Sequence, residues 1–449
     1  MSVIGPNTPG AGVEIPISRY MAGVTDNFPR VNRNRIVEVS IAGRERIDIL
    51  PVNLTSDRRL EGGYIEFRIP GITGRFLDLS KISLELKLSL LKTGNVKLEA
   101  DDYLNLVNGA GNTLFKSVQV YIGDRLVESN PFFNYSSYIK LLSTFKKSNI
   151  DTIGNLGYLF NEKKIEDTYI AASFTGGSAE LKERINNLKT NGLHLNFPLM
   201  LDVSSLEQFL LDNIPVRIRL ELASNNWAIN THQVTADYKL QIDDAKLWID
   251  RIIPNTNALL SLNSSLGKGN KSVDYMFSRT LYKTYVVSAN QTSHIIDLPW
   301  NQIIPDKLYL CMTDLASFSG NFNRNPLYFQ HADVTNIQVQ INGVPLYNIS
   351  AKFPHQTAQA YYETCSALGL GYDHLLTFEG FKNGGTLFVF DFSNEQLDDI
   401  LPLEKSGNLR ISLTFSSGVA HNRLILLFGE SMGILNIYED RTVMCDVRA

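Results

Sequence analysis

Three segments in the first half of the sequence recur, in the same order, in the second half. Each pair joins two stretches of alternating apolar and polar residues with similar flanking residues. The pairs are Ser117–Gly123 with Asn336–Gly343, Ser205–Ser224 with Ser393–Ser417, and Leu247–Ile249 with Leu435–Ile437. Alternating segments can resemble one another by chance, but the shared order of three pairs favours an internal duplication. The matched segments lie closer together in the second half, so we expect two similar domains in tandem, the second one shorter.

The alternation itself predicts the class of fold. A period of two residues is the pattern of a half-buried β-strand, because successive side chains point to opposite faces. The strands that it predicts are Tyr64–Ile69, Ile82–Leu90, Val118–Ile122, Val216–Leu222 and Leu409–Phe415. Asn-Gly pairs, which favour tight hairpin turns because both residues tolerate positive φ, occur at 108–109, 191–192, 342–343 and 383–384.

Helical patterns are scarce in this sequence. Apolar residues have helical spacing at 135–147, and a stretch rich in Glu, Lys and Arg at 179–188 predicts a second helix. The sequence therefore predicts an all-β protein, with two tandem β-sandwiches and a few connecting helices.

The domain boundaries follow from length and composition. A chain of 449 residues is longer than a single hydrophobic core usually supports. We expect an extended N-terminal arm over residues 1–40, because scattered Pro and Gly prevent a continuous helix there. A first domain over 41–254 and a second over 273–449 are then joined by a polar, aperiodic linker at 255–272.

Composition excludes several classes of protein. With 44% hydrophobic and 20% charged residues, the chain can bury a core and is not disordered. No apolar run approaches the roughly 18 residues that cross a bilayer. The first residues lack the pattern of a secretion signal, so we expect folding in a reducing compartment. Cys311, Cys365 and Cys445 lie far apart and are predicted to be buried apolar residues, not disulfides or zinc ligands.

The balance of charge argues against a protein that binds nucleic acid through a basic surface. The formal net charge is −4, whereas such proteins carry a strong positive excess. The arginine-bearing stretch at 30–35 is interpreted first as part of a solvated arm, and second as an arm that faces a genome or a partner.

No pattern of catalytic or ligand-binding residues emerges. The seven histidines are scattered without HxH or HExxH spacing. The glycine-bearing stretches Gly267–Ser272 and Gly369–Gly371 lack the spacing of phosphate and dinucleotide loops, and there is no GxSxG sequence. We therefore predict no catalytic, cofactor-binding or metal-binding residue. The sequence leaves open a catalytic cluster whose residues come together only in the folded protein.

Several segments resemble one family of proteins. In the first half these are Asn105–Leu142, Gly192–Leu195, Val216–Leu220 and Ile242–Leu247; in the second half they are Ile304–Leu308 and Asn325–His331. They are similar to the Polinton-type (adintovirus-like) major capsid proteins of the adenovirus-type lineage, over roughly residues 60 to 447. The string Asn-Pro-Leu-Tyr-Phe-Gln-His at 325–331 is the most specific part of this resemblance.

The resemblance implies a fold and a function. The fold is a double jelly roll, and the function is that of a major capsid protein. Three copies would form a homotrimer, a pseudo-hexameric capsomer that tiles the icosahedral shell of a dsDNA virus. The implied partners are the chain itself, penton and minor capsid proteins, and an enclosed genome bound without sequence specificity. The protein would be located in the virion after assembly inside the host cell, with no membrane span and no cofactor.

Two other functions stay open at this point. One is a tandem β-sandwich that recognises carbohydrate or a cell surface, which the missing secretion signal disfavours. The other is an enzyme on a jelly-roll scaffold, which the missing metal-ligand spacing disfavours.

The N-terminal arm gives a first prediction. We expect that it becomes ordered only on a neighbouring subunit or a minor capsid protein, because its scattered Pro and Gly favour an extended chain. Deletion of residues 2–30 should leave the folded domains intact, as seen by circular dichroism, but impair assembly of trimers or shells. Unchanged assembly in electron microscopy would contradict this expectation.

Overall fold

The computed structural model describes residues 40–54, 63–99, 102, 104–150, 154–160, 188, 192–231, 237–266, 272–353, 355–369, 373, 375–393 and 406–445. They belong to one compact unit, Ser40–Ala449. The predicted arm up to residue 39, including the arginine-bearing stretch at 30–35, lies outside the described residues. So does most of the helix predicted at 179–188.

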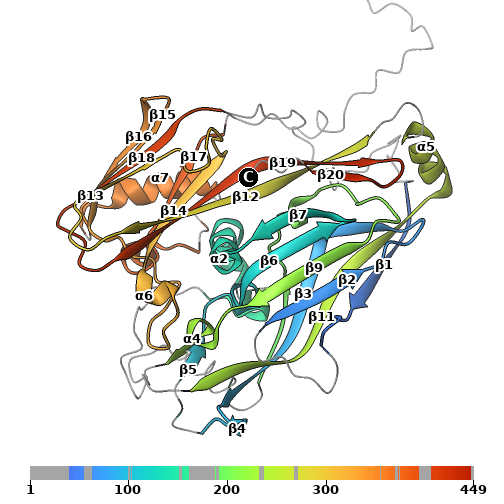
Figure 1. Ribbon diagram of the computed structural model, residues 1–449, viewed down its shortest axis with the longest axis horizontal. Helices are drawn as coiled ribbons and strands as arrows, with labels where there is room; N and C mark the ends of the chain where they lie inside the picture. The colour runs from blue at the N-terminus through green and yellow to red at the C-terminus, as the bar shows by residue number, and fades with distance from the viewer. Residues whose placement is uncertain are drawn as a thin grey trace, which may run out of the picture. The chain divides into compact units, whose positions relative to one another are not determined.

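The unit is built mainly from strands (Figure 1). Residues 41–254 form β1 (Ile41–Ile49), β2 (Tyr64–Ile69), β3 (Phe76–Lys92), β4 (Val96–Lys97), β5 (Leu104–Leu106), β6 (Phe115–Ile122), β7 (Arg125–Asn130), β8 (Leu193–Pro198), β9 (Val216–Leu222), β10 (Ile229–Thr231) and β11 (Tyr238–Pro254). Residues 272–445 form β12 (Ser272–Val287), β13 (Ser293–Asp297), β14 (Lys307–Asp314), β15 (Val334–Ile341), β16 (Val344–Ser350), β17 (Leu387–Asp391), β18 (Leu409–Phe415), β19 (Arg423–Tyr438) and β20 (Val443–Cys445).

Short helices connect these strands. The α-helices are α1 (Ala110–Thr113), α2 (Phe133–Thr144), α4 (Asn225–Ala228), α5 (Thr256–Leu266), α6 (Leu315–Phe318), α7 (Ala358–Leu368) and α8 (Phe378–Lys382). The 3-10 helices are η2 (Lys147–Asn149), η3 (Gly154–Gly157) and η4 (Val203–Ser205). Among the described helices, none combines the length and the apolar character that a membrane crossing requires.

The two halves have the same strand order. In the first half, β1, β11, β3 and β8 form one sheet, and β2, β9, β6 and β7 form another. In the second half the sheets are β12-β19-β14-β17 and β13-β18-β15-β16. Without the short strands β4, β5, β10 and β20, each half has eight strands. In each half, one sheet has the order first, eighth, third, sixth, and the other sheet has the order second, seventh, fourth, fifth. This is the order of an eight-stranded jelly roll, so the prediction of two tandem jelly rolls is confirmed.

The segments matched in the sequence occupy equivalent strands. Val118 of β6 pairs with Leu220 of β9, and the corresponding Ile337 of β15 pairs with Leu413 of β18. Leu247 and Leu435, from the third matched pair, lie in β11 and β19, the eighth strand of each roll. The duplicated sequence therefore repeats both the strand order and, in these sheets, the register.

Alternation explains how each sheet buries one face. Val216, Ile218 and Leu220 of β9 are fully buried, while the intervening Arg217 and Arg219 point outward. Leu409, Ile411 and Leu413 of β18 repeat this arrangement. Burial of each such side chain contributes about 1.5–3 kcal/mol. Because a shift of one residue would expose the whole apolar set, the pattern also fixes the register.

Of the three Asn-Gly pairs that the structure describes in full, one forms a two-residue hairpin. Asn342 and Gly343 connect β15 to β16 with φ angles of 53° and 80°, as a type I′ turn requires. Gly109 instead precedes α1, and Gly384 follows α8. Asn191 lies outside the described residues. The hairpin prediction fails at 108–109 and 383–384 because helix ends use the same positive φ angles as turns.

Two of the longer helices, α5 and α7, were not anticipated. The stretch predicted to be an aperiodic linker contains α5, in which Leu266 is buried and Leu262 packs against the core. The other helix, α7, buries Leu368 and the small side chains of Ala360, Thr364 and Ala367, which give little apolar periodicity. The predicted helix at 135–147 is present as α2, but it ends earlier, where Phe145 is extended.

The hairpin turn between β15 and β16 gives a second prediction. Gly343→Ala places a Cβ in open space but forces a non-glycine residue to φ 80°, which costs about 1–2 kcal/mol. Chemical denaturation should show this loss. Gly43→Ala in β1 is the control, since its Cβ would make ordinary contact with Ile253 at 3.6 Å. Equal stability of the two variants would contradict the assigned turn.

Candidate functional site at the junction of the two jelly rolls

The strand β12 lies at the edge of its sheet, where it pairs only with β19. Its free edge faces the first jelly roll. The backbone N–H of Ser278 donates to Ser205 Oγ at 2.8 Å, and that of Thr280 donates to Asp202 Oδ2 at 2.8 Å. An edge strand with unpaired N–H groups invites pairing with other chains. Side chains around η4 therefore satisfy donors of β12 that its own sheet leaves open.

A buried ion pair anchors this contact. Asp202 Oδ1 accepts hydrogen bonds from Lys140 Nζ of α2 at 2.5 Å and from Thr280 Oγ1 at 2.6 Å. The Asp202 side chain is 5% exposed and that of Lys140 17%. Burial disfavours the charged amine, but the nearby charges of Asp202 and Glu128 outweigh it and raise the pKa of Lys140. Such pairs are favourable only when further hydrogen bonds offset desolvation, as Thr280 does here.

A second carboxyl group lies beside the pair. Glu128 of β7 is buried, and its Oε2 accepts the backbone N–H of Asp202 at 2.9 Å and of Val203 at 3.4 Å. Its Oε1 has no hydrogen-bond partner among the described residues. Burial, with the charge of Asp202 adding to it, raises the pKa of Glu128 to about 8.

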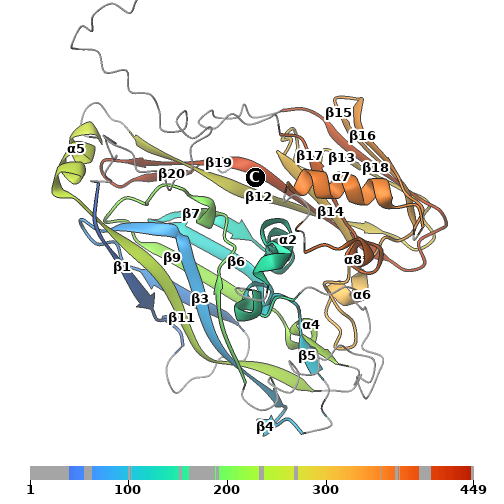
Figure 2. The ribbon, with the colours of Figure 1, turned by 180° about the vertical axis from the view of Figure 1, so that it is seen from behind.

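Aromatic side chains form an adjoining layer. Figures 1 and 2 show α2 between the sheets of the first jelly roll and strands β12 and β14 of the second. Tyr135 of α2 stacks on Phe318 of α6 with 5.7 Å between ring centroids. Trp227 Nε1 donates a hydrogen bond to the Tyr135 hydroxyl at 3.2 Å. Phe329 of the second half packs against Tyr138 at 6.0 Å. Burial raises the pKa of Tyr135, so the hydroxyl stays neutral and polar.

A third contact joins the far ends of the long strands to the first jelly roll. Arg441, in the turn between β19 and β20, donates through Nε to the carbonyl oxygen of Asp212 at 3.0 Å and through Nη2 to its carboxylate. The hydroxyl of Tyr275 on β12 accepts the N–H of Leu211 and donates to the carbonyl oxygen of Phe209, both at 3.1 Å. The two jelly rolls are therefore connected at separate points along β12 and β19.

The most specific part of the family resemblance reaches this junction. In the string at 325–331, Phe329 is fully buried against α2, as described above. His331 turns away and stacks on Phe353 at 4.4 Å. No sequence pattern indicated Glu128, Lys140 or Asp202, because these residues and their partners lie far apart along the chain.

The described histidines and cysteines do not cluster as metal ligands. Among the described residues, no three His, Cys, Asp or Glu side chains group together as metal ligands. His194 Nε2 lies 2.9 Å from Glu85 Oε1 on the first jelly roll, far from His331 in the sequence and the fold. Cys311 and Cys445 are buried and Cys365 is half-buried, all as free thiols. His232, His374 and the glycine-bearing stretch at 267–271 lie outside the described residues.

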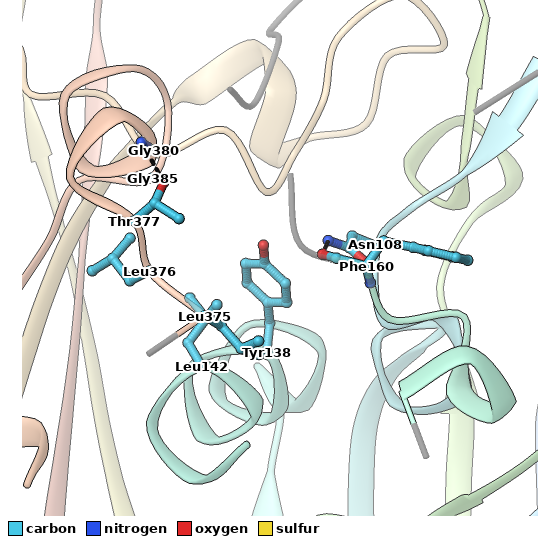
Figure 3. Close-up of a pocket in the computed structure, with 9 residues that line it drawn as sticks. All are labelled: Asn108, Tyr138, Leu142, Phe160, Leu375, Leu376, Thr377, Gly380 and Gly385. Carbon is cyan, nitrogen blue, oxygen red and sulfur yellow. Dashed lines mark hydrogen bonds between the residues drawn. The ribbon is translucent and has the colours of Figure 1, made fainter. Parts of the chain in front are cut away.

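A small pocket also lies between the jelly rolls (Figure 3). The residues that line it are Asn108, Tyr138, Leu142 and Phe160 of the first half, and Leu375, Leu376, Thr377, Gly380 and Gly385 of the second. None of these side chains is charged, and Leu142, Leu375 and Leu376 supply an apolar wall. Its polar side chains are those of Asn108, Tyr138 and Thr377, and Thr377 Oγ1 accepts the N–H of Gly380 at 2.9 Å.

Comparison with known proteins identifies the fold. No protein-family model and no curated protein sequence matches the chain. Among solved structures, a chain of the Sputnik virophage matches with a TM-score of 0.59 and 12% identity, over 100% of this chain and 94% of that one. A chain of the PBCV-1 virus capsid has a TM-score of 0.55 and 11% identity (93% and 99% covered), and the Faustovirus major capsid protein 0.51 and 9% (91% and 92%). At these identities the likeness shows a shared double jelly-roll fold.

The buried pair at the junction gives a third prediction. Asp202→Ala removes the acceptor of Lys140 and Thr280 and leaves a largely buried amine unpaired, which should cost about 3–5 kcal/mol of unfolding free energy. Asp297→Ala is the control, because its pair with Arg410 is 3.5 Å long and exposed and should contribute less than about 1 kcal/mol. Denaturant titration distinguishes them; a loss at Asp202 no larger than at Asp297 would show that the junction does not depend on this pair.

Proposed function

We propose that this chain is a major capsid protein, the structural subunit of a viral shell, and that it acts as a homotrimer. The observation that carries the proposal is the occurrence of one jelly-roll strand order twice in a single chain, with a buried junction between the copies. The likeness in fold to the Faustovirus major capsid protein and to a chain of the PBCV-1 virus capsid supports it.

The duplicated fold explains how three chains can imitate six. Each chain contributes two similar sandwiches, which we assign to residues 41–254 and 273–449, so a ring of three chains presents six related flanks. A closed ring uses the same heterologous contact at every step. Such a capsomer can meet six neighbours in a shell through closely related surfaces, with protein surface buried at each contact.

The outward sheet faces agree with this near-equivalence. Arg217 of β9 and Arg410 of β18 occupy equivalent register positions, opposite Tyr121 and Gln340. The guanidinium of Arg217 lies 3.9 Å from the centroid of the Tyr121 ring, and Arg410 forms an exposed ion pair with Asp297. The two rolls thus present polar faces that are related but not identical. Contacts between capsomers through these faces would then be similar, and differences in charge would distinguish them.

The remaining parts of the proposal follow from the same role. On the sequence resemblance at 325–331, we place the chain in the Polinton-type lineage. The shell would be completed by penton and minor capsid proteins and would enclose a dsDNA genome without reading its sequence. The chain would work by burying surface between subunits and not by catalysis.

Oligomeric state gives the fourth prediction. The purified full chain should elute with three times the mass of one chain in light scattering, and negative-stain images should show compact particles of hexagonal outline. A dilution series serves as the control, because an obligate trimer keeps its mass whereas a weak association loses it. A stable monomer, or a monomer that binds a glycan array, would overturn the proposed function.

A further inference from the structure

The junction holds more carboxyl groups than it can neutralise. Lys140 forms an ion pair with Asp202, the residue that precedes the 3-10 helix η4. Glu128 lies at the start of the same helix, where its Oε2 accepts the N–H of Asp202. With all three groups ionised, the buried cluster would carry a net negative charge. In a medium of low polarity, two carboxylates that share one amine repel one another strongly, so one of them keeps its proton.

The hydrogen bonds identify which carboxyl is neutral. Both oxygens of Asp202 are occupied: Oδ1 by Lys140 and Thr280 Oγ1, and Oδ2 by the Thr280 N–H. Glu128 Oε1 has no partner among the described residues. A carboxylate spreads its charge over both oxygens, so leaving one of them buried without a donor costs far more for the ion than for the neutral acid.

Among the described residues, no second Lys or Arg forms an ion pair with Asp202 or Glu128; Arg279 of β12 donates instead to Cys445 Sγ at 3.2 Å. On β14, the Tyr309 hydroxyl donates to Glu430 Oε1 of β19 at 3.0 Å. Glu430 adds a further negative charge that acts on Lys140. On the same strand as Tyr309, Lys307 Nζ lies 4.0 Å from Asp391 of β17. Lys140 therefore already faces Asp202 and Glu430 before Glu128 is counted.

We propose that Glu128 is a proton-dependent latch: as the neutral acid it leaves Lys140 to Asp202 and holds η4 against β12, and as the carboxylate it competes for Lys140 and loosens that contact. The device lies within a single chain and is independent of whether the chain builds a shell.

The pH dependence follows from the linkage between protonation and folding. The pKa of Glu128 rises from 4.5 to about 8 in the folded protein. Below the unfolded-state pKa the neutral acid is present in both states and its full contribution to stability is retained. As pH rises toward 8 the unfolded chain releases the proton and the folded chain does not, so this contribution is lost progressively. Above about 8 the folded protein also ionises, and the latch opens.

The test compares Glu128→Gln with the wild-type chain. The amide imitates the neutral acid and cannot ionise, so the variant should gain stability relative to wild type as pH rises from 5 to 8. The ratio of the two unfolding equilibrium constants should change by up to tenfold per pH unit. Asp440→Asn is the control: hydrogen bonds from the hydroxyl and the N–H of Thr442 lower the pKa of Asp440, and no histidine contributes to that shift, so its ratio should stay constant over this range. A constant ratio for Glu128→Gln would overturn the proposal.

Hydrogen exchange gives a readout that does not require reversible unfolding. In the wild-type chain, amides of residues 199–206 and 276–282 should lose protection between pH 6 and pH 9, after correction for intrinsic exchange. Peptides from β15 and β18 serve as the internal reference. In Glu128→Gln the same amides should keep their protection. Equal protection of wild type and variant at pH 9 would show that ionisation of Glu128 does not open the junction.

Discussion

The exposed edge of β12 is the constraint on which the rest of this structure depends. A strand of this length at the border of a sheet must find partners for its outward N–H groups or pair with another chain. Here Asp202 and Ser205 supply acceptors for Thr280 and Ser278. Because those acceptors belong to the first jelly roll, satisfying the edge of the second roll also fixes the two rolls together.

The two copies contribute different parts to the junction, mainly connections from the first copy and strands from the second. The sheets repeat in strand order and register, but Lys140 and Tyr135 come from α2 and Asp202 precedes η4, both in the connections of the first copy. The second copy contributes β12, β14 and β19 together with Phe318 and Phe329. The interface between the copies is therefore asymmetric, although their sheets repeat in strand order and register.

The sheets were predictable because their pattern is local. β2, β9 and β18 have the bounds that alternation predicts, and β3 and β6 contain their predicted segments. The helix α7 was not predicted, because its buried residues are mostly small, namely Ala360, Thr364 and Ala367 beside Leu368. The hydroxyl of Thr364 donates to the carbonyl oxygen of Leu387 at 3.2 Å. Its position is set by packing on β17 and not by a strong apolar stripe.

The sequence by itself determined the all-β class, the duplication and the register of the matched strands, since side-chain alternation acts between neighbouring residues and is written into the chain. Only the tertiary structure decided the site. Glu128, Lys140 and Asp202 come from β7, α2 and the start of η4, and their protonation depends on burial and mutual distance. Neither quantity exists until the two jelly rolls have folded against one another, so no pattern in the sequence could have identified this cluster.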